Sequence, residues 1–228
     1  MQIKIINIIL FPEILLSVAI LILLLIGLFQ KENSFKNICN LSVITLIVVC
    51  FLVNYNPRLE IENYQFFFKD SAFIQFFKYL IIIGSAASII ISKNYFIESK
   101  LERFEIPILM LFSALGMMIL ISSNDLISMY LGIELQSLAL YVVAAIKRDS
   151  LKSSESGVKY FVLGALSSGI LLYGCSLIYG FSGSTNFQEI HVNLESLDNL
   201  NLGLIFGLVF VLTGLAFKVS AVPFHMWT

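Results

Sequence analysis

The chain consists largely of long apolar runs separated by short polar stretches. Uncharged runs cover residues 14–30, 37–57, 106–124 and 160–188. A helix that crosses the hydrocarbon core of a bilayer needs ~20 apolar residues. Soluble helices instead alternate apolar and polar faces, and the strands of membrane barrels are shorter and alternate residue by residue. The pattern therefore predicts an all-α integral membrane protein.

We expect about seven transmembrane helices in a single membrane domain that covers residues 1–228. Pro12 and Glu13 precede the first run and no basic segment stands out, so the first run is interpreted as a retained span rather than a signal peptide. The start of the third span is difficult to locate because of Lys78 and the aromatic residues 66–68. The expected spans are approximately 12–29, 38–53, 72–91, 105–122, 125–146, 155–179 and 200–228.

The distribution of Lys and Arg between the loops predicts the orientation of the spans. The loops after the second, fourth and sixth spans contain only Arg58 and Lys69. Cytoplasmic loops are enriched in Lys and Arg, so the amino terminus is expected outside and the odd-numbered loops inside. One alternation fits all six loops, which supports the span count. The loops after the first, third and fifth spans contain Lys31, Lys36, Lys93, Lys100, Arg103, Lys147, Arg148 and Lys152.

Composition narrows the function classes further. Apolar residues make up 58% of the chain and charged residues 13%, about half the usual charged share of a soluble domain. The net charge of −1 gives no indication of a nucleic-acid partner. Cys39, Cys50 and Cys175 lie in or beside apolar runs without Cys-x-x-Cys spacing, so we interpret them as buried hydrophobic residues and expect no metal site.

Three ionisable residues fall inside or just inside the predicted spans: Glu134, Lys159 and Lys218. A charge at the centre of a bilayer costs at least ~2.5–3.5 kcal/mol, so such residues normally face protein or water and mark function. Glu134 lies close to the centre of the fifth span, too deep to reach the interface. The alternative is a protonated glutamate that only forms a hydrogen bond to a neighbouring helix.

Lys159 is one turn into the sixth span, and Glu155 precedes it by four residues, the favourable order for a helical ion pair. An interfacial lysine that extends toward water is an equally good interpretation of its position. Lys218 precedes Pro223 by five residues, and proline removes a backbone donor and clashes with the preceding turn. We therefore expect the seventh helix to break beside Lys218. His225 is either a further relay group or an interfacial residue.

These groups could form a proton path. Burial disfavours the charged form of a carboxyl or amino group, and a nearby opposite charge favours it. A glutamate and a lysine that approach or separate would change the proton affinity of a second lysine. Connecting water would then allow protons to pass.

Four segments resemble subunit N of the proton-pumping NADH–quinone oxidoreductase, the bacterial counterpart of mitochondrial complex I subunit 2. The resemblance runs from near the start of the chain to its last residue, and the segment that ends at Thr228 is the most specific. The segments are Phe11–Leu16, Gly132–Tyr141, Lys159–Ser168 with Leu172–Gly174, and Ala216–Thr228.

The resemblance implies an antiporter-like fold of inverted five-helix repeats with its seventh helix broken. Glu134, Lys159 and Lys218 occupy the positions of the family's proton path. The resemblance also implies that this chain binds no cofactor, and the lack of a Gly-x-Gly-x-x-Gly fingerprint and of a cysteine cluster is consistent with that. NADH, FMN, iron–sulfur clusters and quinone would bind to partner subunits. Expected partners are the other membrane subunits of complex I and the lipid bilayer, in a bacterial or mitochondrial inner membrane.

Family members continue well beyond the segment that ends at Thr228, so we expect this chain to be an amino-terminal fragment that stops within its seventh span. A non-pumping, truncated remnant is therefore one alternative. A subunit of a related multisubunit cation/proton antiporter or membrane hydrogenase is another.

Overall fold

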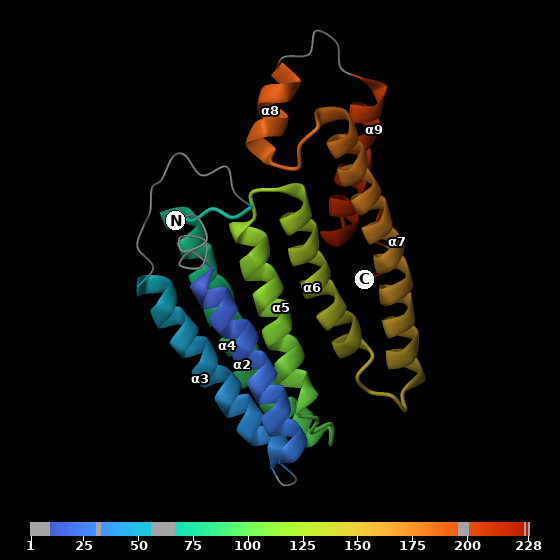
Figure 1. Ribbon diagram of the computed structural model, residues 1–228. Helices are drawn as coiled ribbons and strands as arrows, with labels where there is room; N and C mark the ends of the chain where they lie inside the picture. Colours follow the sequence, from blue (N-terminus) through green and yellow to red (C-terminus); the bar gives the residue numbers. More distant parts are fainter. Residues whose placement is uncertain (1–9, 31–32, 56–66, 196–200, 226, 228) are drawn as a thin grey trace. The chain divides into compact units, whose positions relative to one another are not determined.

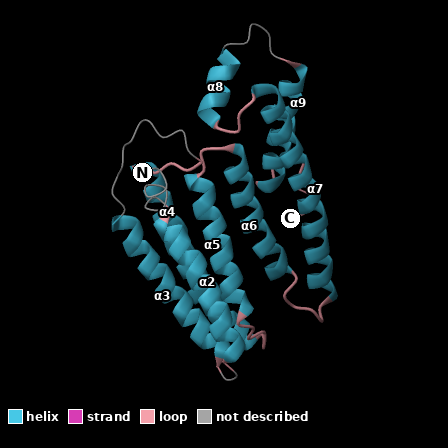
Figure 2. Cartoon of the chain, viewed as in Figure 1, coloured by secondary structure: helices cyan, strands magenta, loops and turns pink. Residues whose placement is uncertain are grey.

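The computed structural model describes residues 10–30, 33–55, 67–195, 201–225 and 227. These residues form helices joined by loops (Figure 2). Within these ranges there is no strand, and Asp125 and Asn186 form an isolated bridge. The predicted all-α class is confirmed.

Among the described residues, seven apolar helices correspond to the predicted spans (Figure 1). Six are long and apolar enough to cross a membrane, and α9 is a shorter apolar helix. The structure also contains α8, a short helix in a segment that the sequence analysis treats as a loop. The helices are α2 (Phe11–Phe29), α3 (Ser34–Tyr55), α4 (Ala72–Glu98), α5 (Glu105–Ser122), α6 (Leu126–Ala144), α7 (Leu151–Ser182), α8 (Phe187–Glu195) and α9 (Leu202–Lys218).

Side chains at the caps define where several helices begin and end. The Ser71 hydroxyl accepts a hydrogen bond from the Ile74 amide at 3.2 Å at the start of α4. Asp125 caps α6 in the same way through the amide of Ser128, at 3.1 Å. Gly183 ends α7 with φ of 75°, a left-handed conformation that glycine adopts without strain.

The chain divides into two compact units, residues 1–62 with 68–122 and residues 63–67 with 123–228. In the first unit, α3 packs against α2, α4 and α5, and α5 also contacts α2 and α4. Its core contains Leu16, Ile20 and Leu46, each fully buried. In the second unit, α7 packs against both α6 and α9 and makes its most extensive contact with α9.

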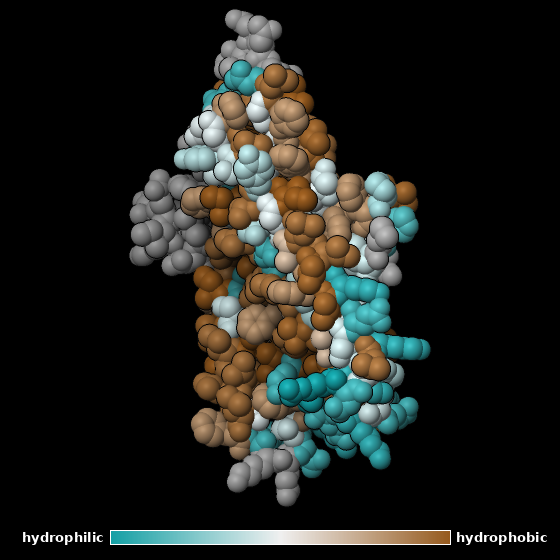
Figure 3. Space-filling view, turned by 90° about the vertical axis from the view of Figure 1, so that its right-hand side faces the viewer, coloured by the Kyte–Doolittle hydropathy of each residue, from teal (hydrophilic) through white to brown (hydrophobic). Residues whose placement is uncertain are grey.

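Large apolar side chains remain exposed along the helices, as expected of surfaces that face lipid. On α7 these include Val158, Phe161 and Leu166, all more than half exposed. Figure 3, viewed from the right-hand side of Figure 1, shows a face covered mainly by hydrophobic residues. The exposed apolar surface and the helix lengths together agree with a multi-pass membrane protein.

An ion pair that the sequence analysis did not predict lies inside the first unit. Lys78 of α4 is 1% exposed and is the largest fully buried side chain among the described residues. Its Nζ lies 2.7 Å from Oε1 of Glu13, which is in the first turn of α2 and 4% exposed. Glu13 and Lys78 thus add a buried acid and a buried base to the three ionisable residues that the sequence singled out.

We predict that Lys78→Met destabilises the protein more than the double variant Glu13→Gln/Lys78→Met. The single change leaves a buried carboxylate without its counter-charge, which costs about 3–5 kcal/mol, whereas the double change leaves no charge to compensate. Thermal unfolding in detergent, followed by circular dichroism, measures the difference. Lys93→Met is the control, because Lys93 forms an exposed hydrogen bond with Asn40. Equal stability of the single and double variants would contradict this prediction.

Candidate functional site

Glu134 lies near the middle of α6, on a side of the helix that also carries Ser137 and Tyr141. Residues three, four and seven positions apart share one face of an α-helix, which places these three polar groups in a row. The Glu134 side chain is 18% exposed, and Ser137 and Tyr141 are buried. The row therefore presents a carboxyl group and two hydroxyl groups inside the second unit.

Lys218 of α9 contacts this row of polar side chains on α6. Its Nζ lies 3.4 Å from Oε1 of Glu134, donates a hydrogen bond to Oγ of Ser137 at 2.9 Å, and contacts the Tyr141 hydroxyl at 3.3 Å. The Lys218 side chain is 16% exposed. The ammonium group therefore has a counter-charge and two further acceptors, one for each of its three N–H donors.

A third helix supplies a donor to the same carboxyl group. The Ser168 hydroxyl on α7 donates a hydrogen bond to Oε1 of Glu134, the oxygen that faces Lys218. Ser167, the preceding residue, donates to the carbonyl oxygen of Gly214 on α9 at 3.4 Å. Two consecutive serines thus connect α7 to α6 and to α9, and all three helices meet at Glu134.

The site depends on close packing between α7 and α9. A Cβ atom at Gly174 would lie 2.7 Å from the backbone nitrogen of Val211, and backbone atoms cannot move aside at low cost. Glycine at this position lets the two backbones come together. The approach keeps Lys218 within reach of α6 and α7.

Contacts with Tyr160 and with the backbone near Gly164 hold the Tyr141 side chain in place. Its ring packs edge-on against Tyr160, with the ring centroids 4.5 Å apart. A Cβ atom at Gly164 would lie 2.1 Å from the Tyr141 hydroxyl oxygen, so this space on α7 is open only because residue 164 has no side chain. The hydroxyl can therefore occupy a position next to the Lys218 ammonium group.

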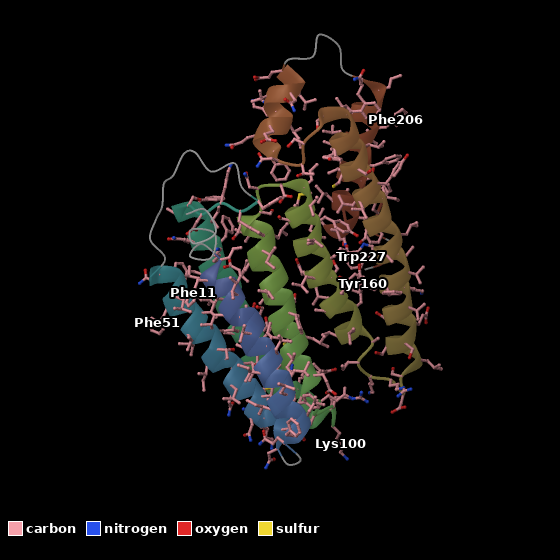
Figure 4. All side chains as sticks on the ribbon, in the orientation of Figure 1. Phe11, Phe51, Lys100, Tyr160, Phe206 and Trp227 are labelled. Carbon is pink, nitrogen blue, oxygen red and sulfur yellow. The ribbon has the colours of Figure 1, made fainter. Side chains whose placement is uncertain are left out.

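A stack of aromatic rings continues from Tyr160. The rings of Tyr160 and Trp227 lie parallel with centroids 4.6 Å apart, and both are labelled in Figure 4. Trp227 also stacks on Phe217 and donates its indole N–H to the Phe217 carbonyl oxygen at 3.1 Å. These contacts attach the segment after α9 to α7 and to the end of α9.

The predicted break of the seventh helix is confirmed. α9 ends at Lys218, and Ser220 adopts a φ of 54°, which is incompatible with a continuing helix. The Ala221 amide folds back to the Ala216 carbonyl oxygen at 2.8 Å. Pro223 follows within the turn, as the sequence predicted. Lys218 therefore lies at a helix end inside an otherwise helical unit.

Of the four predicted site residues, the structure brings together Glu134 and Lys218. Lys159 instead pairs with Glu155 at 2.5 Å, and both side chains are about 60% exposed. This is the local ion pair that the four-residue spacing indicated. His225 is exposed in the segment after α9. The roles of Lys159 and His225 in a proton path stay predictions.

Sequence reasoning missed the hydroxyl groups of Tyr141 and Ser168, which complete the site. Tyr141 and Ser168 lie inside motif segments, but serine and tyrosine are common in membrane helices and carry no signal of their own. Among the described residues, no three His, Cys, Asp or Glu side chains come together as metal ligands. That this chain binds no metal or cofactor stays a prediction.

Comparison with known proteins supports the resemblance seen in the motifs. Residues 123–228 match the family described as NADH:quinone oxidoreductase/Mrp antiporter, TM. The chain is 50% identical over 217 residues to NADH-quinone oxidoreductase subunit N 1 of Rhizobium meliloti (strain 1021). It is 52% identical over 220 residues to NADH-quinone oxidoreductase subunit N of Pelagibacter ubique (strain HTCC1062). Over residues 123–228 the chain is similar to this antiporter-like family.

Each of these two alignments covers 95% of this chain and 45% of the relative, so the chain spans about half the length of the curated relatives it matches. Among solved structures, a chain of respiratory complex I from Thermus thermophilus with bound aureothin matches with a TM-score of 0.72 and 26% identity. That match covers 95% of this chain and 46% of the other. A chain of the Mrp complex from Dietzia sp. DQ12-45-1b matches with a TM-score of 0.67 and 19% identity, over 95% of this chain and 42% of that chain, which shows a shared fold alone.

We predict that Gly164→Ala destabilises the protein and that Gly169→Ala does not. The added methyl group at residue 164 meets the Tyr141 hydroxyl, and overpacking of this kind costs about 1–3 kcal/mol. Residue 169 has nothing within 4 Å of its Cβ position, and alanine favours a helix over glycine by roughly 0.5–1 kcal/mol. Thermal unfolding in detergent compares the two variants.

Removing the Tyr141 hydroxyl group should restore part of the stability that Gly164→Ala loses. In the double variant Gly164→Ala/Tyr141→Phe the atom closest to the new methyl group is absent. We expect its unfolding midpoint to lie between those of Gly164→Ala and the parent. A double variant less stable than Gly164→Ala would show that the methyl group clashes with something else.

Proposed function

We propose that this chain contributes part of the proton path of subunit N of NADH–quinone oxidoreductase, and that quinone reduction in partner subunits drives it. The observation that carries the proposal is the contact between Lys218 and Glu134, with Ser137, Tyr141 and Ser168 around it. The match of residues 123–228 to the antiporter-like family supports it. The chain spans 45% of the relatives' length, so the path proposed for it is a part of the whole.

The proposed proton transfer follows from the placement of the Glu134–Lys218 charge pair in surroundings of low polarity. With Glu134 in contact, the Lys218 ammonium group is electrically compensated and hydrogen-bonded. An opposite charge at this distance interacts far more strongly inside a protein than in water. When the contact opens, the ammonium group loses its counter-charge, and transfer of a proton to a water molecule or to a neighbouring base relieves the imbalance.

The surrounding hydroxyl groups position the two charges. Ser168 holds one oxygen of Glu134, and Ser137 holds the ammonium group of Lys218. A hydroxyl group both donates and accepts, so Ser137 and Tyr141 can also connect Lys218 to water when Glu134 moves away. The approach or separation of the Glu134 and Lys218 side chains would thus be coupled to which group holds the proton.

Lys159 and His225 enter the proposal as further members of the path. Lys159 lies on α7 at the family's motif position, and its side chain is 60% exposed. His225 follows the break after α9 and is exposed. An imidazole takes up and releases protons near neutral pH, which suits a relay group.

The proposal extends to the surroundings of the chain. The partners are other membrane subunits of complex I, and NADH, FMN, iron–sulfur clusters and quinone bind to those partners. The location is a bacterial or mitochondrial inner membrane, with the amino terminus outside as the loop charges indicate. The likeness to the Mrp complex lies below 25% identity, so it does not favour a cation/proton antiporter over this function.

The experiment that tests the proposal uses Glu134→Gln and Lys218→Ala in the full-length protein within the assembled complex. Each change removes one charge of the pair, so we expect proton pumping to fall several-fold relative to NADH oxidation. Membrane vesicles report pumping through a pH-sensitive dye, and NADH absorbance reports oxidation. Pumping that matches the parent in both variants would show that the assigned roles are wrong.

We predict that Lys159→Met also lowers pumping, whereas Lys152→Met on the same helix leaves it unchanged. Lys152 is exposed in the first turn of α7 and has no place in the proposed path, so it controls for loss of a surface charge. The same vesicle assay gives the comparison. Equal pumping by the two variants would remove Lys159 from the path and leave only its ion pair with Glu155.

A further inference from the structure

The first unit contains an acid–base pair that the proposed path does not use. Glu13 of α2 and Lys78 of α4 are 4% and 1% exposed, and 2.7 Å separates Oε1 from Nζ. By contrast, the side chains of the exposed pair formed by Glu155 and Lys159 are more than half accessible. Burial to this degree means that protein atoms, rather than solvent, surround both charges of the inner pair.

The hydrogen bonding of Glu13 is incomplete. Neither of its carboxylate oxygens accepts a hydrogen bond with acceptable geometry from any described residue, so the contact with Lys78 is an ion pair only. A carboxylate that several donors hold is fixed in its charged form. Glu13 has oxygens available to take a proton, and Lys78 is the adjacent group that can supply one.

Stability does not account for this pair. Replacing a buried ion pair by apolar residues of similar volume is often neutral or stabilising by about 1–4 kcal/mol. Ionisable residues within membrane-spanning helices that pair with each other commonly mark proton relays. The physical argument therefore favours a role in proton exchange over a role in holding α2 against α4.

Polar groups lead from the start of α4 toward the pair. The Gln75 side chain is buried and donates to Oδ2 of Asp70 at 3.1 Å, and it lies one turn before Lys78. Oδ1 of Asp70 is buried and accepts no hydrogen bond from any residue that the structure describes. Asp70, Gln75 and Lys78 thus form a row of polar side chains that begins in the segment preceding the helix.

On the helices that pack around Glu13 and Lys78, the other charged residues lie far from this pair. α3 packs against both α2 and α4, and its lysine, Lys36, lies in its first turn, near where α2 ends. Glu105 lies at the start of α5, which follows the far end of α4. Lys69 precedes Asp70 in the connecting segment, and Tyr79 follows Lys78 on α4. Asp70 is therefore the acidic group closest in sequence to Lys78.

We propose that Glu13 and Lys78 are a second proton-exchanging pair of this chain. In the exchange, an N–H bond of the Lys78 ammonium group breaks and an O–H bond forms on Glu13, which leaves a neutral amine and a neutral carboxylic acid. No electron is transferred, and the total number of protons on the pair is unchanged. Water at the start of α4 then takes the proton from Glu13, which becomes a carboxylate again, and a hydronium ion of the same water gives a proton to the Lys78 amine and restores the ammonium group.

The loop charges place the beginnings of α2 and α4 on the same, outer side of the membrane. Glu13 is in the first turn of α2, and Lys78 is within two turns of the start of α4. The pair therefore exchanges protons with the outer side. The assignment to the outer side uses the orientation that the loop charges of the whole chain predict, but it does not require the function proposed for Glu134 and Lys218.

Infrared difference spectroscopy of the whole chain in lipid nanodiscs tests the proposal. A buried carboxylic acid has a carbonyl-stretching band that its carboxylate lacks, so the spectrum reports directly on whether Glu13 takes a proton. The parent carries Glu134→Gln to remove the carboxyl group of the other site. The test variant adds Glu13→Gln and Lys78→Met together, since either change alone leaves a buried charge unpaired.

We expect a carboxylic-acid band that grows as the pH is lowered while circular dichroism shows the helices intact. The band should be present in the parent and in a control that carries Glu98→Gln, because Glu98 is an exposed residue of α4. The variant that lacks Glu13 and Lys78 should show a weaker band, because the contribution of Glu13 is missing from it while the other carboxyl groups remain. Identical spectra from the parent and this variant would show that the pair stays ionised and only joins α2 to α4, which would overturn the proposal.

Discussion

An ammonium group within membrane-spanning helices needs a counter-charge and an acceptor for each of its N–H donors, and this need determines how α6, α7 and α9 meet. Glu134, Ser137 and Tyr141 supply these groups to Lys218 from one face of α6. Ser168 then ties α7 to the same carboxyl group. The polar cluster is small, yet it connects all three helices.

Apolar packing brings these helices close enough for the cluster to form. The approach of α7 to α9 is possible because Gly174 has no side chain where the backbone of α9 passes. The Tyr141 hydroxyl likewise occupies space that Gly164 leaves open. Without water to drive apolar surfaces together, membrane helices rely on small residues of this kind for close packing. The charges are therefore positioned by residues that carry no charge.

The sequence predicted well whatever depends on position along the chain. Apolar run length identified the spans, Pro223 identified the break after Lys218, and the four-residue spacing identified the pair of Glu155 with Lys159. The sequence did not predict the burial of Lys78. This residue looks like an interfacial lysine because it follows closely after a polar segment. Its partner, Glu13, is on a helix separated from it by the whole of α3. A single sequence does not show which residues of distant helices face each other, so the most buried lysine was interpreted as a boundary.

The position of Lys218 at the end of α9 adds an electrostatic effect that side-chain contacts do not include. The aligned peptide dipoles of a helix place about half a negative charge at its carboxyl end, where the last carbonyl groups lack intrahelical partners. Lys218 is in the last turn of α9, so its positive charge lies beside this end. Extending α9 through Ser220 would move the negative end away from the ammonium group. The length of the helix and the charge on its last residue are therefore linked electrostatically.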